Sequence, residues 1–128
     1  MAYKPRAVDL KLREQRLQLY QTARSISSSF PALEHISLQV RFSGADRLSP
    51  YRQIYTGDMQ AYFILQCPSR DCEGGGFDLT RAITAAAKSA SGIAAGTAAC
   101  SGALATSGRR GDACPVTLNY DVDCVRRD

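Results

Sequence analysis

Two segments of the chain alternate between apolar and polar residues, and this pattern predicts two strands. From His35 to Phe42 every second residue is apolar and the intervening residues are polar. The same alternation runs from Val116 to Val122, where Asp121 and its neighbours occupy the polar face. A period of two places one face of each strand against a core and the other in water.

A third apolar segment has a different pattern. Residues 61–67 are almost continuously apolar and rich in aromatic and branched side chains, which predicts a central strand covered on both faces. Residues 95–100 have small side chains and predict a further short strand. Residues 43–58 contain Gly, Pro and Asp, so we expect a long turn region there, with a short strand at Gln53–Thr56.

Apolar spacing also predicts two helices, the first over residues 8–28. One face of this helix has the apolar side chains expected in the core: Leu12, Leu19, Ala23 and Ile26. Leu10 and Leu17 lie on roughly the opposite face. They either pack within the fold or form a second apolar stripe that meets a partner. The second helix is predicted over residues 78–90, with Asp78 as its N-cap and Gly92 at its end.

The predicted order is therefore helix, two strands, helix, two strands. Alternating strands and helices in a chain of 128 residues fit a single domain over residues 1–128. The fold class is α+β, with a mainly antiparallel sheet of about four strands packed by two helices.

Composition and charge narrow the class of protein. Hydrophobic residues make up 45% and charged residues 22%, as in ordinary globular domains. The N-terminal residues have no apolar run of the signal-peptide type. The Ala-rich stretch 82–106 includes Lys88 and several polar residues, so we expect a cytoplasmic protein without a membrane segment. Residues 1–30 have six basic and two acidic side chains, which equals the net charge of +4.

Four of the five cysteines have the spacing C-x4-C-x27-C-x13-C and are candidate ligands for a structural zinc ion: Cys67, Cys72, Cys100 and Cys114. In a reducing compartment, clustered cysteines are more often metal ligands than disulfides. Three of them fall at the ends of predicted strands, so a metal at one edge of the sheet could gather them. This zinc would tie together one end of the fold, within residues 61–124.

Two other interpretations of the cysteines stay open. Cys67 and Cys72 could form a disulfide or a thiol redox pair, or the cysteines could simply be buried. An iron–sulfur cluster is a minor case, because Gly75 occupies the third position of the plant-type C-x4-C-x2-C run. Cys124 shares its parity with Val122, which favours a core position, although it could replace one of the four ligands.

The segment from Ala61 to Cys124 resembles the zinc-ribbon and treble-clef domains, in which a hairpin loop, a helix and returning strands bring four ligands together. Those families use C-x2-C pairs, whereas the pairs here are more widely spaced. The resemblance implies a structural metal with no open coordination position and implies no activity.

Other patterns point only weakly to chemistry. Gly74-Gly75-Gly76 before a helix could hold a phosphate, but no Walker pattern follows, and a turn in a metal-binding loop explains it as well. His35, the only histidine, lies in no catalytic motif. Asp121 and Asp123 share a face that we expect in water. We therefore expect a protein that is not an enzyme.

Two kinds of partner remain. The two-faced first helix favours a protein-interaction or assembly module, which binds a protein partner or forms a homodimer through Leu10 and Leu17. Nucleic-acid binding is the alternative. It would use the basic N-terminal segment, Arg109-Arg110 and Arg126-Arg127, with Tyr51 and Tyr55 beside Arg47 and Arg52 as stacking side chains.

Overall fold

A computed structural model describes residues 7–44, 50–105 and 111–127, with side chains from Leu10 onward. Its centre is a four-stranded antiparallel sheet with the strand order β2-β1-β8-β6. The strands are β1 (Leu33–Ser43), β2 (Tyr51–Thr56), β6 (Ile93–Ala99) and β8 (Thr117–Arg126). The α+β class and the predicted antiparallel sheet are confirmed.

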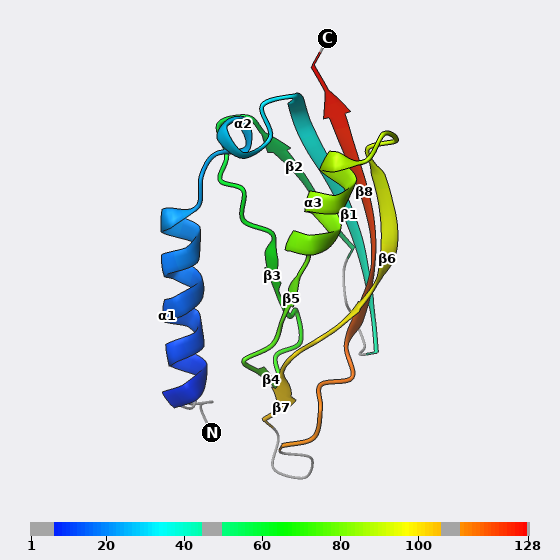
Figure 1. Ribbon diagram of the computed structural model, residues 1–128. Coiled ribbons are helices and arrows are strands. Elements are labelled where there is room, and N and C mark those ends of the chain that lie inside the picture. Colours follow the sequence, from blue (N-terminus) through cyan, green and yellow to red (C-terminus); the bar gives the residue numbers. More distant parts are fainter. Residues whose placement is uncertain (1–6, 45–49, 106–110, 128) are drawn as a thin grey trace.

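The alternating segments form the two central strands. Ile36, Leu38 and Val40 of β1 are at most 1% exposed, and the residues between them face outward. On β8, Leu118 and Val122 are buried in the same way. A strand with one polar face needs cover on the other face only, and this sheet is covered on one side (Figure 1).

The cover consists of helix α3 (Thr80–Lys88), the short helix α2 (Ile26–Ser29) and two small two-stranded sheets. Strand β3 (Ile64–Gln66) pairs with β5 (Gly76–Asp78), and β4 (Cys72–Glu73) pairs with β7 (Ala103–Leu104). Helix α3 buries Ile83 and Ala86 and begins two residues later than predicted. The predicted N-cap at Asp78 is wrong, because Leu79 occupies that position, but the Asp78 carboxylate accepts a hydrogen bond from the Thr80 N–H at 3.0 Å.

The predicted first helix is divided into two. Helix α1 spans Ala7–Thr22, and the chain leaves the helix before α2 begins. The cause is a bridge to the segment around Gln60: the N–H of Ala61 donates to the Arg24 carbonyl at 2.7 Å, and that of Ile26 donates to the Met59 carbonyl at 2.8 Å. Ser25 then caps α2 by accepting a hydrogen bond from the Ser28 N–H.

This division changes which leucines are buried. Ile26 lies in the core as predicted, but Leu19 is 54% exposed, so its predicted core position is wrong. Leu12 and Ala23 are half-buried. Helix α1 lies beside the body of the protein and not against the main sheet (Figure 1).

Two strand predictions also need correction. Residues 61–67 do not form a central strand, since only Ile64–Gln66 are extended and they belong to a separate small sheet. The apolar side chains of residues 61–67 pack without a regular strand, and Phe63 is 2% exposed in the core. The fourth strand of the main sheet is instead β2, which contains the short strand predicted at Gln53–Thr56. Within the predicted loop 101–112, Ala103–Leu104 form β7, and residues 106–110 lie outside the described residues.

Within these described ranges, no helix combines the length and the apolarity that crossing a membrane requires.

Candidate metal centre

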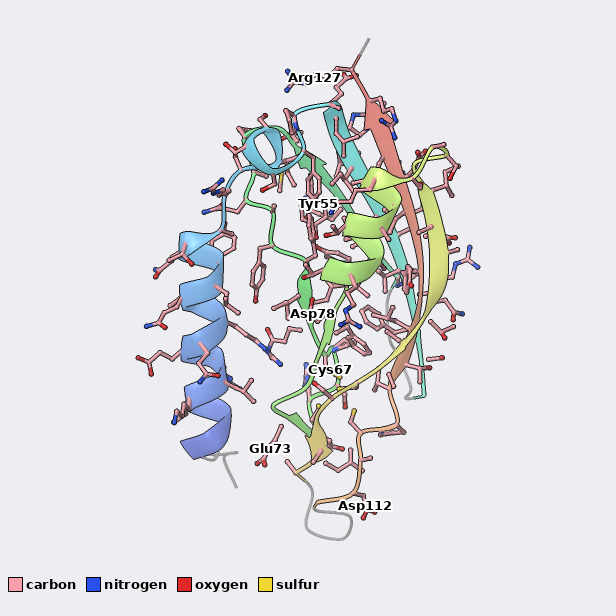
Figure 2. All side chains as sticks on the ribbon, in the orientation of Figure 1. Tyr55, Cys67, Glu73, Asp78, Asp112 and Arg127 are labelled. Atoms are coloured by element: carbon pink, nitrogen blue, oxygen red, sulfur yellow. The ribbon has the colours of Figure 1, made fainter. Side chains whose placement is uncertain are left out.

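The four cysteines selected by their spacing converge in space. The Sγ atoms of Cys67, Cys72, Cys100 and Cys114 all lie within 4.8 Å of one another. The Sγ atoms of Cys67 and Cys114 are 3.9 Å apart, and those of Cys72 and Cys100 are 3.6 Å apart. Figure 2 places Cys67 low in the molecule, near the strand labelled β4 in Figure 1.

Each cysteine is placed by the end of a strand or by the strand itself. Cys67 follows β3 directly, Cys72 begins β4, and Cys100 follows β6. Cys114 precedes β8, and its N–H donates to the Gly102 carbonyl at 3.0 Å. The Cys100 N–H donates to the Val116 carbonyl at 3.0 Å, so the third and fourth cysteine segments are held side by side.

Two glycines allow the backbone to approach the sulfur atoms. A Cβ atom at Gly75 would overlap the Sγ of Cys72 and would lie 2.7 Å from the Sγ of Cys100. A Cβ atom at Gly102 would lie 2.5 Å from the Sγ of Cys72. Any residue other than glycine at these positions would displace a thiol, so Gly75 belongs to the site and not to a phosphate-binding loop.

The surroundings of Cys67, Cys72 and Cys100 shift the pKa values of these thiols in different directions. Burial raises the pKa of Cys67 to about 12 and raises the pKa of Cys72 as well. Burial also acts to raise the pKa of Cys100, but the Gly102 N–H, 3.4 Å from its Sγ, and hydrogen bonds from the other three thiols outweigh it and lower that pKa. Cys100 therefore ionises more readily than Cys67 or Cys72 when no cation is bound.

The arrangement suits one small cation. Zinc–sulfur bonds of about 2.3 Å in a tetrahedron require sulfur atoms about 3.8 Å apart, close to the two separations given above. Four thiolates would fill the coordination sphere and leave no position for water or substrate. A cluster with several iron atoms needs its thiolates spread around a larger core, so four sulfurs this close favour a mononuclear site.

No family model, no curated protein and no solved structure matches this chain. The resemblance to zinc-ribbon and treble-clef domains therefore rests on the residues from Ala61 to Cys124 alone.

The remaining cysteine is separate from this group. Cys124 is 5% exposed and lies in the core on β8, as its parity predicted. It is not among the four converging residues. The five cysteines are free thiols, and the sulfur contacts of 3.9 Å and 3.6 Å join Cys67 to Cys114 and Cys72 to Cys100.

The stacking role predicted for Tyr55 is wrong. Tyr55 is 6% exposed and packs edge-on against Phe63, with ring centroids 5.1 Å apart, so it cannot stack on a base. The Arg126 guanidinium donates to the Ser89 carbonyl at 2.6 Å, and that of Arg127 donates to the Leu33 carbonyl at 3.1 Å. These tail arginines thus bind the protein itself. Arg47, Arg109 and Arg110 lie outside the described residues.

No sequence pattern predicted the groove between α1 and the loop 67–75, called the cysteine loop below. It has a volume of about 900 Å³, and Arg13, Arg16 and Tyr20 of α1 line one side. Arg16 crosses to the glycine loop, where its Nη1 donates to the Gly75 carbonyl at 2.8 Å. One sequence feature could have predicted the groove. Arg13, Arg16 and Tyr20 share one helix face between the leucines, and this spacing indicates a polar face toward the body of the protein.

Proposed function

We propose that this protein is a small zinc-binding interaction module in which the metal is structural. The observation that carries the proposal is the approach of four cysteine sulfurs to within 4.8 Å of one another. An all-sulfur tetrahedral set is typical of structural zinc, whereas catalytic zinc keeps one open position. A closed coordination sphere supports a structural and not a catalytic role for the metal itself.

The zinc would hold segments that have little other support. Strands β4 and β7 contain two residues each, too few to be stable as an isolated pair. Ligands from Cys67 and Cys72 on one side, and from Cys100 and Cys114 on the other, would join these segments through the ion. In small metal sites of this kind, the free energy of metal binding contributes directly to folding.

Elemental analysis of protein purified without chelator tests the metal. We expect about one zinc ion per chain for the native protein and for Cys124→Ser, whose side chain lies outside the four-cysteine group. Cys100→Ser should lose the zinc and unfold at a lower temperature. A Cys100→Ser protein that keeps its zinc and its stability would contradict this ligand set, and iron in place of zinc would contradict the choice of metal.

The interaction part of the proposal is supported by α1. Leu10 is 51% exposed and Leu17 is 55% exposed, and both lie on the same flank of the helix. Large apolar side chains grouped on an exposed helix are typical of a docking surface. We propose that this Leu10–Leu17 flank binds a protein partner, or a second copy of the chain at high concentration.

Sedimentation velocity tests the flank through self-association. The native protein should sediment partly as a dimer at high concentration, and Leu17→Asp should sediment as a monomer. Gln18→Asp is the matched control, because Gln18 is exposed on the same helix and does not line the groove. Association through apolar contacts should change little with salt. The same species for the native protein and Leu17→Asp would show that the flank is not an interface.

A further inference from the structure

The charged side chains that line the groove between α1 and the cysteine loop are basic. Among the described residues, its arginines are Arg13 and Arg16 on α1 and Arg70 between the first two cysteines, and none of the described side chains that line it is acidic. Four thiolates with Zn²⁺ would have a formal charge of −2, which three guanidinium groups exceed. The groove therefore keeps a positive balance beside the filled metal site and favours a negatively charged ligand.

Strand β3 offers a free backbone edge to this groove. Gln66 of β3 pairs with Gly76 of β5, and the Gly76 carbonyl accepts a hydrogen bond from the Ser101 N–H, on the side away from β3. Gln66 and Gly76 are therefore a non-hydrogen-bonded pair, and in such an antiparallel pair both residues direct their N–H and C=O groups away from each other. The N–H and C=O groups of Gln66, and of Ile64 two residues earlier, therefore point away from β5.

Ile64 and Gln66 also line the groove, and β3 lies on the side of β5 that is nearer α1 (Figure 1). Among the described strands, β3 pairs with β5 alone. An unpaired edge of this kind can take an additional strand, whose main chain supplies the hydrogen bonds. Basic side chains would then select the sequence of that strand.

We propose that this groove binds an extended acidic segment of a partner protein, which pairs with the outer edge of β3 and places carboxylates against Arg13 and Arg70. The inference rests on the proposed interaction function and specifies its partner. Arg16 is held by the carbonyls of Gly74 and Gly75 and closes one end of the groove. Arginine forms two parallel hydrogen bonds with a carboxylate, which gives such a contact its specificity.

A peptide fits the groove better than a nucleic acid does. Tyr20 and Tyr62 are the aromatic residues in its lining, and they contact each other edge to face, with centroids 5.5 Å apart. Their mutual contact occupies ring surface that a base would need for stacking. A free strand edge and the apolar side chains of Leu17 and Ile64 suit an extended polypeptide with alternating residues.

Fluorescence anisotropy with a labelled peptide of four Glu-Val repeats tests the proposal on the zinc-loaded, full-length protein. The peptide should bind saturably, and Arg13→Gln/Arg70→Gln should bind it about tenfold more weakly, since each charged pair contributes a few-fold. Lys11→Gln/Arg81→Gln removes the same charge at exposed positions outside the groove and should bind as the native protein does. A peptide that is methylated on alternate backbone nitrogens cannot donate the hydrogen bonds of an added strand. The native protein should bind it at least as weakly as Arg13→Gln/Arg70→Gln binds the unmodified peptide.

Three results would overturn the proposal. They are equal binding of a Gln-Val peptide, binding of a twelve-residue oligothymidylate in place of the acidic peptide, and unchanged binding by the groove variant. Zinc content is measured on the same samples. A protein that holds zinc and does not bind the peptide refutes the groove alone. A protein that contains no metal as purified and still binds the peptide refutes the zinc site alone.

Discussion

The guanidinium group of Arg16 donates one hydrogen bond to the Gly75 carbonyl, at 2.8 Å, and another to the Gly74 carbonyl, at 3.3 Å. Gly75 also lies directly against the sulfur atoms of Cys72 and Cys100. The glycine loop therefore contacts the cysteine group on one side and helix α1 on the other. Its three glycines differ in role: Gly74 has a φ of +65°, and Gly76 has Arg16 within contact distance of any added Cβ.

Substitution of Arg16 by Met should loosen α1 without affecting the main sheet. The side chain keeps its apolar length and loses two hydrogen bonds made by a charged donor, which contribute on the order of 1.5–3 kcal/mol. Amide hydrogen exchange should become faster in residues 10–22 and stay unchanged in β1 and β8. Lys11→Met is the control, because Lys11 is exposed on the same helix. Unchanged exchange in α1 would mean that Arg16 does not hold the helix.

Removal of the metal should have a similar effect on α1. Without zinc, the loop 67–76 loses the restraint that fixes the two carbonyl acceptors of Arg16. We expect a chelator to speed amide exchange in α1, β4 and β7 while the four-stranded sheet stays protected. The sheet supplies much of the core itself, since Ile36, Leu38 and Leu118 are fully buried, and Cys67 and Cys114 lie in the same apolar cluster. Global unfolding on chelation would show that the metal supports the whole domain.

Local patterns predicted the parts of this fold that depend on neighbouring residues. Alternation identified β1 and β8 because each has one face in the core and one in water. Spacing and residue type identified the four cysteines, because three of them fall at the ends of predicted strands that can meet at one edge of a sheet. These features are set within a few residues or by the chemistry of one side chain.

Features set by distant contacts were not predictable in this way. The break after Thr22 depends on hydrogen bonds between residues 24–26 and 59–61, which no local pattern records. A short strand was predicted at Gln53–Thr56, but its pairing with β1 as the edge strand of the main sheet depends on contacts between distant segments. The groove depends on where α1 lies, and that position follows from Arg16 reaching a loop 59 residues away.

Replacement of Gly75 by Ala should abolish metal binding with little change in the sheet. The added Cβ would overlap the Sγ of Cys72 and would lie 2.9 Å from the Cβ of Cys67, so at least one ligand must move. We expect a zinc content near zero by elemental analysis. Gly111→Ala is the control: its φ of +91° makes alanine cost about 1 kcal/mol, but no atom of the described residues lies within 4 Å of the new Cβ. Normal zinc content in Gly75→Ala would contradict the described sulfur positions.

Stability at high pH should depend on Tyr55. Burial raises the pKa of this phenol above its ordinary value of 10.0, and the neighbouring Tyr51 adds to the rise. Because the folded pKa is higher than the unfolded one, the folded state holds the proton more tightly. The stabilising contribution is complete below pH 10 and is lost as the pH rises above it, by up to about 1.4 kcal/mol per pH unit.

Urea unfolding of the zinc-loaded protein between pH 8 and pH 11 measures this dependence. Tyr55→Phe keeps the ring that packs against Phe63 and removes the ionisable hydroxyl, so its stability should fall less steeply above pH 10. Tyr20→Phe is the matched control, because Tyr20 is 46% exposed on helix α1 and does not contribute to the rise of the Tyr55 pKa, so this variant should keep the native slope. Equal slopes for the native protein and Tyr55→Phe would mean that the Tyr55 phenol is accessible to water, and β2 would then not cover the core as described.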